Sequence, residues 1–332
     1  MIKLGVIYGG ISTEHDVSLM SAKSVIDNLD KEKYEIHEIY INQYGKWFEY
    51  KDGEREEIYN LIWKLKELDV VFPVLHGKGG EDGTIQGMLE MLQVPYVGCG
   101  VLASSVGMDK VYTKIVFEKA EIPQAPYIYI RKLEKDYLIV NKNFEEEEFN
   151  LEKITSKLKY PMFVKPSNSG SSVGVKKATI DQELKMAIHH AGEYDTKILV
   201  EQGIDGKEVE CAILDGKEVL ASTVGEIMSA EDFYSFDAKY NIPESKTVIP
   251  ANITEEQIEE IRKLAVRAFK AIDGKGLSRV DFFVEKETNK IYINEINTLP
   301  GFTKISMYPK LFEAVGVSYS ELLDKLIENA MK

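Results

Sequence analysis

The sequence of 332 residues has few cysteines, no long apolar run and an excess of acidic over basic side chains. Its two cysteines, Cys99 and Cys211, lie far apart and outside any CxxC pattern, which argues against a disulfide framework or a zinc site. No segment approaches the roughly 20 apolar residues of a membrane span. A net charge of −14 argues against DNA or RNA as a partner. The apolar run at residues 2–8 is too short for a signal peptide, so we expect a cytoplasmic protein without a membrane partner.

A pair of strand-like segments, residues 277–284 and 291–297, is the most informative feature that is present. The polar linker between them has the length of a hairpin loop. Side chains alternate along a strand, so residues of one parity share a face. On the first strand these are Arg279, Asp281 and Phe283, and on the second they are Ile293, Glu295 and Asn297.

A turn centred on Thr288 would place Asp281 directly opposite Glu295. Like charges that face each other across a sheet destabilise it unless a cation lies between them. Carboxylate and amide oxygens, as on Asp281, Glu295 and Asn297, suit Mg²⁺, which binds a few carboxylates together with substrate phosphates. The apolar residues around these positions favour a magnesium site over an exposed hairpin edge.

The chain divides into three expected segments. Residues 1–104 alternate strands and helices, which predicts a parallel sheet with a ligand at the carboxyl ends of its strands. Residues 105–190 form a second segment, in which the acidic run 145–148 is expected to be a solvated loop or helix end. Residues 191–332 form a third, which contains the hairpin.

Hydrophobic periodicity predicts the individual elements. The expected strands, besides the hairpin, are 2–8, 36–41, 70–75, 127–130, 162–165 and 197–200. The expected helices are 16–29, 84–92, 108–120, 254–272 and 319–330.

Two segments have residue types suited to a nucleotide. Small residues in the loop from Lys165 to Gly174 would let backbone N–H groups approach phosphate oxygens, although a plain hairpin loop fits the local pattern equally well. Lys165 would supply a counter-charge, and Lys110 could reach the same phosphates. Glu201 could accept from an adenine amino group and Glu208 from ribose hydroxyls, or both could simply be solvated in an acidic turn.

Two further segments suggest substrate contacts. Residues 225–251 lack clear periodicity but are rich in aromatic side chains, which favours a lid over a disordered segment. Glu14 follows a glycine loop and precedes a helix, so it could hold a cationic amine or act as a helix cap.

The chain resembles the D-alanine–D-alanine ligases of the ATP-grasp superfamily through seven motifs in the family's order. They are GGISTEHDVS, FPVLHGKGGEDGTIQGMLE, VGMDK, FVKPSNSGSSVGV, FDAKY, SRVDFF and NEINTLPGFTKISMYP. The resemblance covers nearly the whole chain and is weakest at 42–66 and 131–158. It implies an N-terminal α/β substrate domain, followed by central and C-terminal α+β subdomains that sandwich ATP, with a lid at 225–251.

The resemblance also implies residue roles at the nucleotide. The positions that match the family's ATP-binding residues are Lys110, Lys165, Glu201, Gln202, Glu208 and Lys239. Those that match its Mg²⁺ ligands are Asp281, Glu295 and Asn297, with two ions expected and Mn²⁺ as a substitute. The carboxylate of one D-alanine would attack the γ-phosphate to give an acyl phosphate, and the amine of the second would then attack that carbonyl. Arg279 and the N–H of Gly301 would stabilise the oxyanion.

The amino-acid substrates would contact a different set of residues. By the same resemblance, Glu14, Ser171 and Tyr240 would bind the first amino group, with His76 nearby. Ser306 matches the position that receives the second carboxylate. Lys304 departs from the pattern of other members and could take part in that contact. Tyr240 favours D-alanine over D-lactate at the second site and leaves D-serine open.

Alternatives from other classes are weaker. A nucleotide-dependent oxidoreductase would need G-x-G-x-x-G spacing, which GGIST lacks. A non-catalytic ATP-binding regulatory protein would lack metal ligands or the oxyanion arginine, and all of these are present. We therefore expect a ligase acting in peptidoglycan precursor synthesis, with D-alanine and ATP as substrates. The family resemblance further implies a homodimer.

Overall fold

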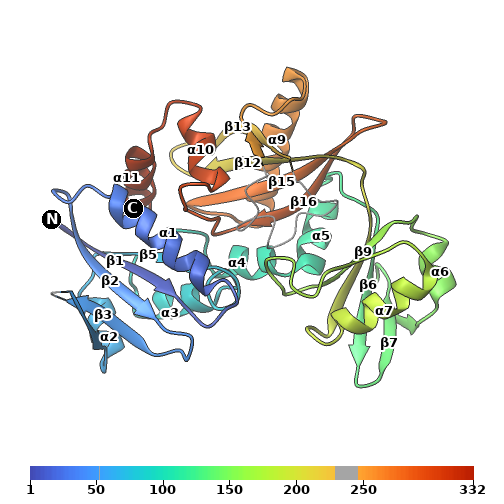
Figure 1. Cartoon of the computed structure of the whole chain (residues 1–332), viewed down its shortest axis with the longest axis horizontal. Coiled ribbons are helices and arrows are strands. Elements are labelled where there is room, and N and C mark those ends of the chain that lie inside the picture. The colour runs from blue at the N-terminus through green and yellow to red at the C-terminus, as the bar shows by residue number, and fades with distance from the viewer. Residues whose placement is uncertain (52, 229–245) are drawn as a thin grey trace.

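The computed structural model describes residues 1–51, 53–228 and 246–332, and its described strands form three sheets. In Figure 1 the first sheet (blue) lies at one end of the molecule and the second (green) at the other. The third sheet, yellow to red, lies between and above them. The N-terminal parallel sheet followed by two further sheets confirms the predicted mixed α/β architecture.

The first sheet has the order β4-β3-β2-β1-β5, in which β1 runs parallel to both β2 and β5. Its strands are β1 (Ile2–Gly9), β2 (Tyr34–Ile41), β3 (Trp47–Lys51), β4 (Glu54–Glu57) and β5 (Val70–Val74). Its helices are α1 (His15–Asn28), α2 (Leu61–Lys66) and α3 (Thr84–Leu92). The parallel core therefore matches the prediction, whereas the antiparallel ribbon β3–β4 was not predicted.

The second sheet is antiparallel at each pairing, in the order β10-β9-β11-β6-β7-β8. Its strands are β6 (Tyr127–Leu133), β7 (Asp136–Val140), β8 (Glu146–Glu148), β9 (Met162–Pro166), β10 (Lys176–Ala178) and β11 (Lys197–Gln202). Helices α6 (Leu151–Thr155) and α7 (Asp181–Ala191) accompany it. Because β11 pairs with β9 and β6, this segment extends to Gln202 rather than ending at residue 190 as expected.

The acidic run at 145–148 was wrongly expected to be a loop or a helix end. Residues Glu146–Glu148 form the edge strand β8, which pairs with β7. Arg131 and Lys153 pair with carboxylates of this strand at 2.9 Å and 2.7 Å. The run therefore pairs as a strand because basic side chains neutralise part of its charge at a solvated edge.

The third sheet has the order β14-β13-β12-β15-β16. Its strands are β12 (Gly206–Leu214), β13 (Leu220–Met228), β14 (Lys246–Val248), β15 (Leu277–Glu285) and β16 (Ile291–Asn297). Helices α9 (Glu255–Ala271), α10 (Met307–Glu313) and α11 (Tyr319–Ala330) follow in this segment. Helix α9 begins with a capping box between Thr254 and Gln257, a sequence signal that fixes where a helix starts.

The helix predicted at 108–120 is α5 (Lys110–Lys119), and a further helix before it, α4 (Val101–Met108), was not predicted. Asp109 separates them with an extended backbone, and its side chain accepts from the N–H of Tyr112 at 3.2 Å. An aspartate in this position satisfies a donor that the first turn of a helix leaves unpaired, so it starts a new helix.

The hairpin β15–β16 confirms the predicted pairing of Asp281 with Glu295. A shift of register follows immediately, because Phe282 lies opposite Ile293 and leaves Asn294 as an extra residue. Ile293 therefore packs in the apolar core and does not share a face with Glu295, as the simple alternation had predicted.

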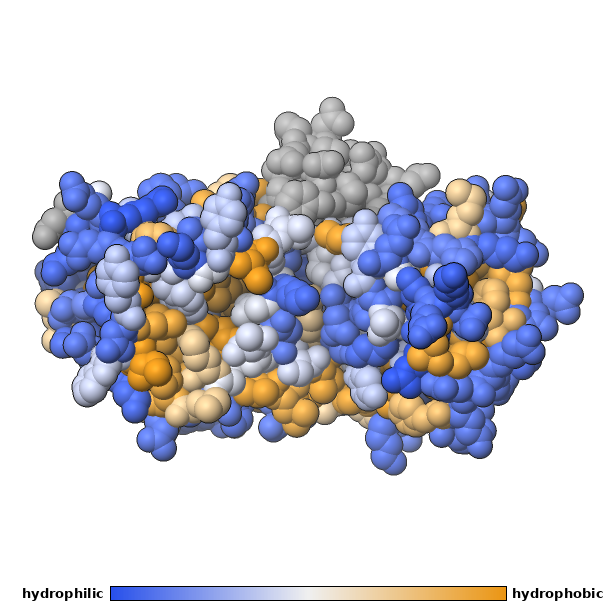
Figure 2. Space-filling model, turned by 90° about the horizontal axis from the view of Figure 1, so that it is seen from below, coloured by the Kyte–Doolittle hydropathy of each residue, from blue (hydrophilic) through white to orange (hydrophobic). Residues whose placement is uncertain are grey.

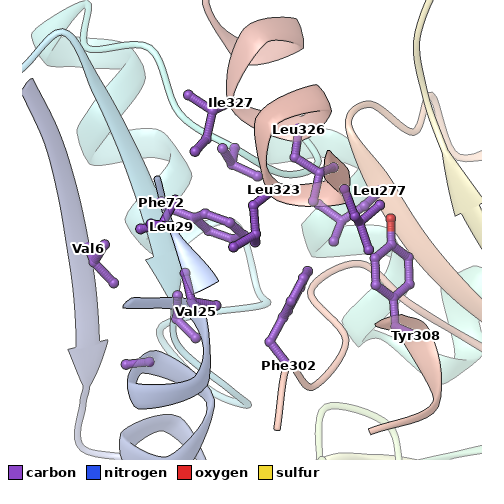
Figure 3. Close-up of a cluster of buried hydrophobic side chains, with 14 of the residues drawn as sticks. Val6, Val25, Leu29, Phe72, Leu277, Phe302, Tyr308, Leu323, Leu326 and Ile327 are labelled. Carbon is purple, nitrogen blue, oxygen red and sulfur yellow. The ribbon is translucent and has the colours of Figure 1, made fainter. Parts of the chain in front are cut away.

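The first and third segments share one hydrophobic core. Figure 3 shows Val25 and Phe72 of the first segment packed beside Phe302 and Leu323 of the third. The rings of Phe72 and Phe302 meet edge to face, with centroids 5.4 Å apart. The second segment has its own core around Ile130. The sheet of the second segment therefore packs on its own core, whereas Phe117 of α5 belongs to the core of the third segment.

One face of the molecule is mostly hydrophilic. Figure 2 shows one face on which polar and charged residues predominate, with apolar patches between them. Within the described ranges no helix is long and apolar enough to cross a bilayer.

Candidate functional site

A cavity of about 590 Å³ opens between the second and third sheets and is also lined by loops of the first segment. Its wall includes Glu14, His76, Lys110, Lys165, Ser171, Glu201, Gln202, Glu208, Arg279, Glu295, Asn297, Gly301 and Ser306. The structure thus brings together most of the residues that the sequence singled out, from three segments of the chain.

Two lysines hold a buried glutamate at one end of the cavity. Glu201, on β11, has its Oε2 2.7 Å from Lys165 Nζ and its Oε1 2.5 Å from Lys114 Nζ. Burial alone would raise the pKa of Glu201, but the two lysines lower it to about 2. Burial tends to lower the pKa of Lys165, yet Glu201 and the more distant Glu295 and Glu208 raise it. Glu201 and Lys165 are therefore both charged at neutral pH.

The serine-rich loop lies beside these lysines and is tied to the start of α5. The N–H of Lys110 donates to Ser167 O at 3.1 Å, and its Nζ donates to Ser169 O at 2.6 Å. The carboxylate of Asp109 accepts hydrogen bonds from the hydroxyl of Ser167 and from the ammonium of Lys197. These contacts place the ammonium of Lys110 and the backbone of the loop on the same wall of the cavity.

The hairpin supplies a dense ion-pair cluster at the centre of the cavity. Arg279 donates from Nε and Nη2 to the two oxygens of Asp281 at 2.8 Å and 2.7 Å, and it lies 3.1 Å from Glu210 Oε2. Asn297 Nδ2 donates to Asp281 Oδ2 at 3.0 Å. Burial would lower the pKa of Arg279, but Asp281 and Glu210 raise it well above its usual value. The arginine is therefore a permanent cation facing the cavity.

The donor set of the hairpin fits a magnesium ion. Glu295 and Asn297 line the cavity, and Asp281 lies opposite Glu295 on the adjacent strand. Each carboxylate has about four lone-pair directions, so the bonds from Arg279 and Asn297 leave acceptor capacity on Asp281. Within the described part of the chain, no group of three or more His, Cys, Asp or Glu side chains could hold a metal by itself. Phosphate oxygens and water usually complete a magnesium shell that has only two carboxylates.

The opposite end of the cavity is acidic. Glu14 is almost fully buried and accepts the hydroxyl of Ser171, which bridges the first and second segments. A Cβ atom on Gly77 or Gly170 would lie within 3.0 Å of Glu14 Oε2, at 2.3 Å and 2.8 Å. Gly77 also has a φ of 71°, which favours glycine. Both loops thus close tightly on this carboxylate.

Glu81 is a second carboxylate near Glu14. Its Oε1 accepts from the N–H of Gly77 at 2.8 Å. Burial, and then the charge of Glu14, raise the pKa of Glu81 to about 8, although Gly77 and Arg279 oppose the shift. Glu81 therefore retains its proton over much of the neutral range, while Glu14 faces the cavity beside it.

His76 connects the first and third segments beside this acidic end. Its Nδ1 lies 3.3 Å from Leu299 O, so Nδ1 donates, and its Nε2 accepts from Ser21 Oγ at 3.0 Å. Ser21 Oγ also accepts from the N–H of Phe302 at 3.3 Å. Burial lowers the pKa of His76, which keeps the ring neutral and in the Nδ1–H form.

Ser306 is held at the N-terminus of α10 by its neighbour Thr303. The N–H of Thr303 donates to Ser306 Oγ at 2.9 Å, and the two hydroxyls lie 2.8 Å apart. Gly301, Ile305 and Ser306 line the cavity, whereas Lys304 is solvent-exposed and lies outside the wall formed by the described residues. The expected residues Tyr240 and Lys239, and most of the expected lid at 225–251, fall outside the described residues.

Three residues of the site were missed by the sequence analysis. Lys114 follows Lys110 by one helical turn, and this spacing was the available signal. Glu210 follows Glu208 by two residues on β12, which places both side chains on one face. Glu81 lies in the glycine-rich loop after β5, where a parallel sheet gathers its ligands.

Comparisons with known proteins agree with one another. Residues 3–99 match the family described as D-ala D-ala ligase N-terminus, and residues 116–328 match the D-ala D-ala ligase C-terminus. The chain is 50% identical to a D-alanine–D-alanine ligase of Acetivibrio thermocellus, over 98% of this chain and 95% of the relative. It is 47% identical to one from Clostridium acetobutylicum, over 99% of this chain and 97% of the relative.

Two solved structures have the same fold. VanG D-Ala:D-Ser ligase from Enterococcus faecalis superposes with a TM-score of 0.86 at 35% identity, covering 99% of both chains. D-alanine–D-alanine ligase from Bacillus anthracis complexed with ATP superposes with a TM-score of 0.80 at 33% identity, covering 100% of this chain and 98% of that one.

Proposed function

Because this chain belongs to the D-alanine–D-alanine ligase family, we propose that its cavity has a nucleotide end and an amino-acid end. The chain is an ATP-dependent ligase that joins two D-alanines for peptidoglycan synthesis. The observation that carries the division of the cavity is its charge. Two lysines converge on Glu201 at one end. At the other end Glu14 lies beside Glu81, and no lysine or arginine among the described residues forms an ion pair with Glu14.

At the nucleotide end, ATP would lie against the second sheet. Lys165, Lys110 and the backbone of the serine-rich loop would contact phosphates, and Glu208 would contact the ribose. Both oxygens of Glu201 already accept from lysines, so its proposed contact with adenine would compete with these ion pairs. Gln202 lines the cavity, and its Oε1 accepts from the N–H of Lys159 at 2.9 Å, which leaves its amide N–H groups as donors for the base.

Asp281, Glu295 and Asn297 would hold magnesium, in two ions with Mn²⁺ as a substitute, and the metal would supply positive charge to the phosphate oxygens. Arg279 is fixed by Asp281 and Glu210 before any substrate arrives. A cation held in place in this way stabilises developing negative charge without reorganising during the reaction.

At the amino-acid end, Glu14 would bind the ammonium of the first D-alanine, with Ser171 as its partner. The carboxylate of this D-alanine would attack the γ-phosphate of ATP, forming a D-alanyl phosphate and ADP. The amine of the second D-alanine would attack the acyl carbon and release phosphate. Arg279 and the N–H of Gly301 would stabilise the oxyanion, and His76 would limit the pocket beside the first substrate.

For the second substrate we favour D-alanine over D-serine. The curated relatives with 46% to 50% identity are D-alanine–D-alanine ligases, whereas the D-Ala:D-Ser ligase of known structure is 35% identical. Ser306, fixed by Thr303, would receive the carboxylate of this substrate, and the exposed Lys304 could only approach it from the rim. We further propose a cytoplasmic homodimer, on the family resemblance alone.

The experiment is a competition between the two amino acids. Purified protein is incubated with ATP, Mg²⁺, D-alanine and an equal concentration of D-serine, and the dipeptides are identified by mass. We expect ADP, phosphate and mainly D-alanyl-D-alanine. An excess of D-alanyl-D-serine would reject the proposed preference. Catalysis without Mg²⁺ or Mn²⁺, after treatment with a chelator, would reject the proposed metal site.

A further inference from the structure

Lys114 is a buried cation for which the reaction described above has no direct use. It lies on α5, which in Figure 1 lies between the second and third sheets. Its side chain is about 4% exposed, and Lys114 is absent from the cavity wall that the described residues form. A buried ammonium is costly unless it is paired, so its retention calls for a physical reason.

The partner of Lys114 is the carboxylate that also holds Lys165. Glu201 lies between the two ammonium groups, with 2.5 Å to Lys114 and 2.7 Å to Lys165. Lys165 and Glu201 line the cavity, and Lys114 stands behind them. The ring of Tyr127 covers Lys114 at 5.3 Å from its Nζ, which further stabilises the cation.

Lys114, Glu201 and Lys165 form a row of three charged groups, and the net charge of this row explains why a second lysine is needed. The pKa of Lys165 is raised by the carboxylates of Glu201, Glu295 and Glu208, so this one cation faces an acidic surrounding. Without Lys114, the pair of Lys165 with Glu201 would have no net charge and would attract a phosphate weakly. Burial lowers the pKa of Lys114, and its 2.5 Å ion pair with Glu201 opposes that shift. With Lys114 protonated, the three groups carry one net positive charge, which Lys165 presents to the cavity.

We propose that Lys114 is a positioning residue for ATP, which neutralises Glu201 from behind so that Lys165 remains available to the phosphates. This inference rests on the proposed contact between Lys165 and ATP. By this inference, the main role of Glu201 is to pair with the two lysines and hold them in place. Lys114 acts through Glu201 and Lys165 and does not touch the nucleotide.

The test compares steady-state kinetics of variants of the full-length enzyme. Lys114→Met should raise KM for ATP by about tenfold and leave KM for D-alanine unchanged, since only the nucleotide end loses charge. Lys114→Arg should restore KM for ATP to within about threefold of the wild-type value, because it keeps the cation. Lys119→Met, an exposed lysine at the end of the same helix, is the matched control and should have wild-type kinetics.

A double variant separates charge from packing. Lys114→Met combined with Glu201→Gln removes one charge of each sign and restores the net charge of the row. Because Glu201 is itself a proposed ATP contact, the double variant is compared with Glu201→Gln alone. In that background Lys114→Met should change KM for ATP by less than about threefold, since the carboxylate that Lys114 neutralises is absent. A rise of about tenfold or more from Glu201→Gln to the double variant, or an unchanged KM in a folded Lys114→Met, would overturn the inference.

Lys165→Met distinguishes this inference from the proposed nucleotide site. If Lys165→Met raises KM for ATP and Lys114→Met does not, only the role of Lys114 is wrong. If neither substitution changes KM for ATP, the assignment of this end of the cavity to the nucleotide is also wrong. Melting temperatures of all variants report whether each one is folded.

Discussion

Two glutamates that line the same cavity, Glu201 buried and Glu81 largely buried, have opposite pKa shifts. The lysines beside Glu201 outweigh the effect of burial and lower its pKa to about 2. At the other end, burial and Glu14 raise the pKa of Glu81 to about 8. Residue type and burial are similar at the two positions, so the neighbouring charges decide the difference. The charged lysines beside Glu201 fit the proposed phosphate contacts, and the carboxylate of Glu14 beside a protonated Glu81 fits the proposed ammonium contact.

Substitutions in the hairpin cluster of Asp281, Glu295 and Asn297 should have the largest effect on turnover. Asn297→Ala or Glu295→Gln should lower kcat by about two to three orders of magnitude, because charge on the transferring phosphoryl group loses its compensation. Glu287→Gln, an exposed change in the turn of the same hairpin, serves as the control. Circular dichroism should show the same fold for all three variants. Near wild-type turnover in Asn297→Ala or Glu295→Gln would refute the metal assignment.

The pKa of Glu81 should be visible in the pH dependence of stability. Its folded pKa of about 8 lies above the ordinary value of 4.5, so the folded state binds the extra proton. The free energy of unfolding should therefore fall as pH rises from about 4.5 to about 8. Glu81→Gln should remove this contribution. Urea unfolding at pH 5.5 and 8.5 measures it, and equal losses in wild type and variant would show that Glu81 is not protonated in the fold.

The contribution of Glu201 to the free energy of unfolding should change with pH in the opposite sense. The change that can be measured should be smaller, because it falls at acid pH. Its folded pKa of about 2 lies below the ordinary value of 4.5, so its contribution to stability is complete above pH 4.5. That contribution is lost as the pH falls toward 2. Glu201→Gln should be less stable than wild type at pH 7 but should lose less stability between pH 5 and pH 3. Parallel acid titrations of the two proteins would contradict the low pKa.

The sequence could predict contacts that depend on one local rule. The pairing of Asp281 with Glu295 follows from the short linker of one hairpin, and the structure confirms it. The face of Ile293 could not be predicted, because one extra residue in β16 reverses the alternation. The start of α5 after Asp109 had a local signal, since aspartate is a common N-cap, whereas the preceding helix α4 was not predicted.

Contacts between elements far apart in the sequence were beyond local reasoning. Lys114 meets Glu201 only because α5 packs against β11, and Ser171 meets Glu14 only because the second segment closes over the first. Family resemblance supplied many of the site residues, but it did not show which charges neutralise one another. The pKa values of Glu81 and Glu201 depend on those three-dimensional neighbours.

The division of the cavity into two ends is tested most directly by one pair of variants. Steady-state KM values for ATP and for D-alanine are measured for Glu14→Gln and for Lys165→Met, each alongside wild type. We predict a crossed pattern, in which Glu14→Gln raises KM for D-alanine with little change for ATP and Lys165→Met does the reverse. Equal increases in both KM values for either variant would contradict the division.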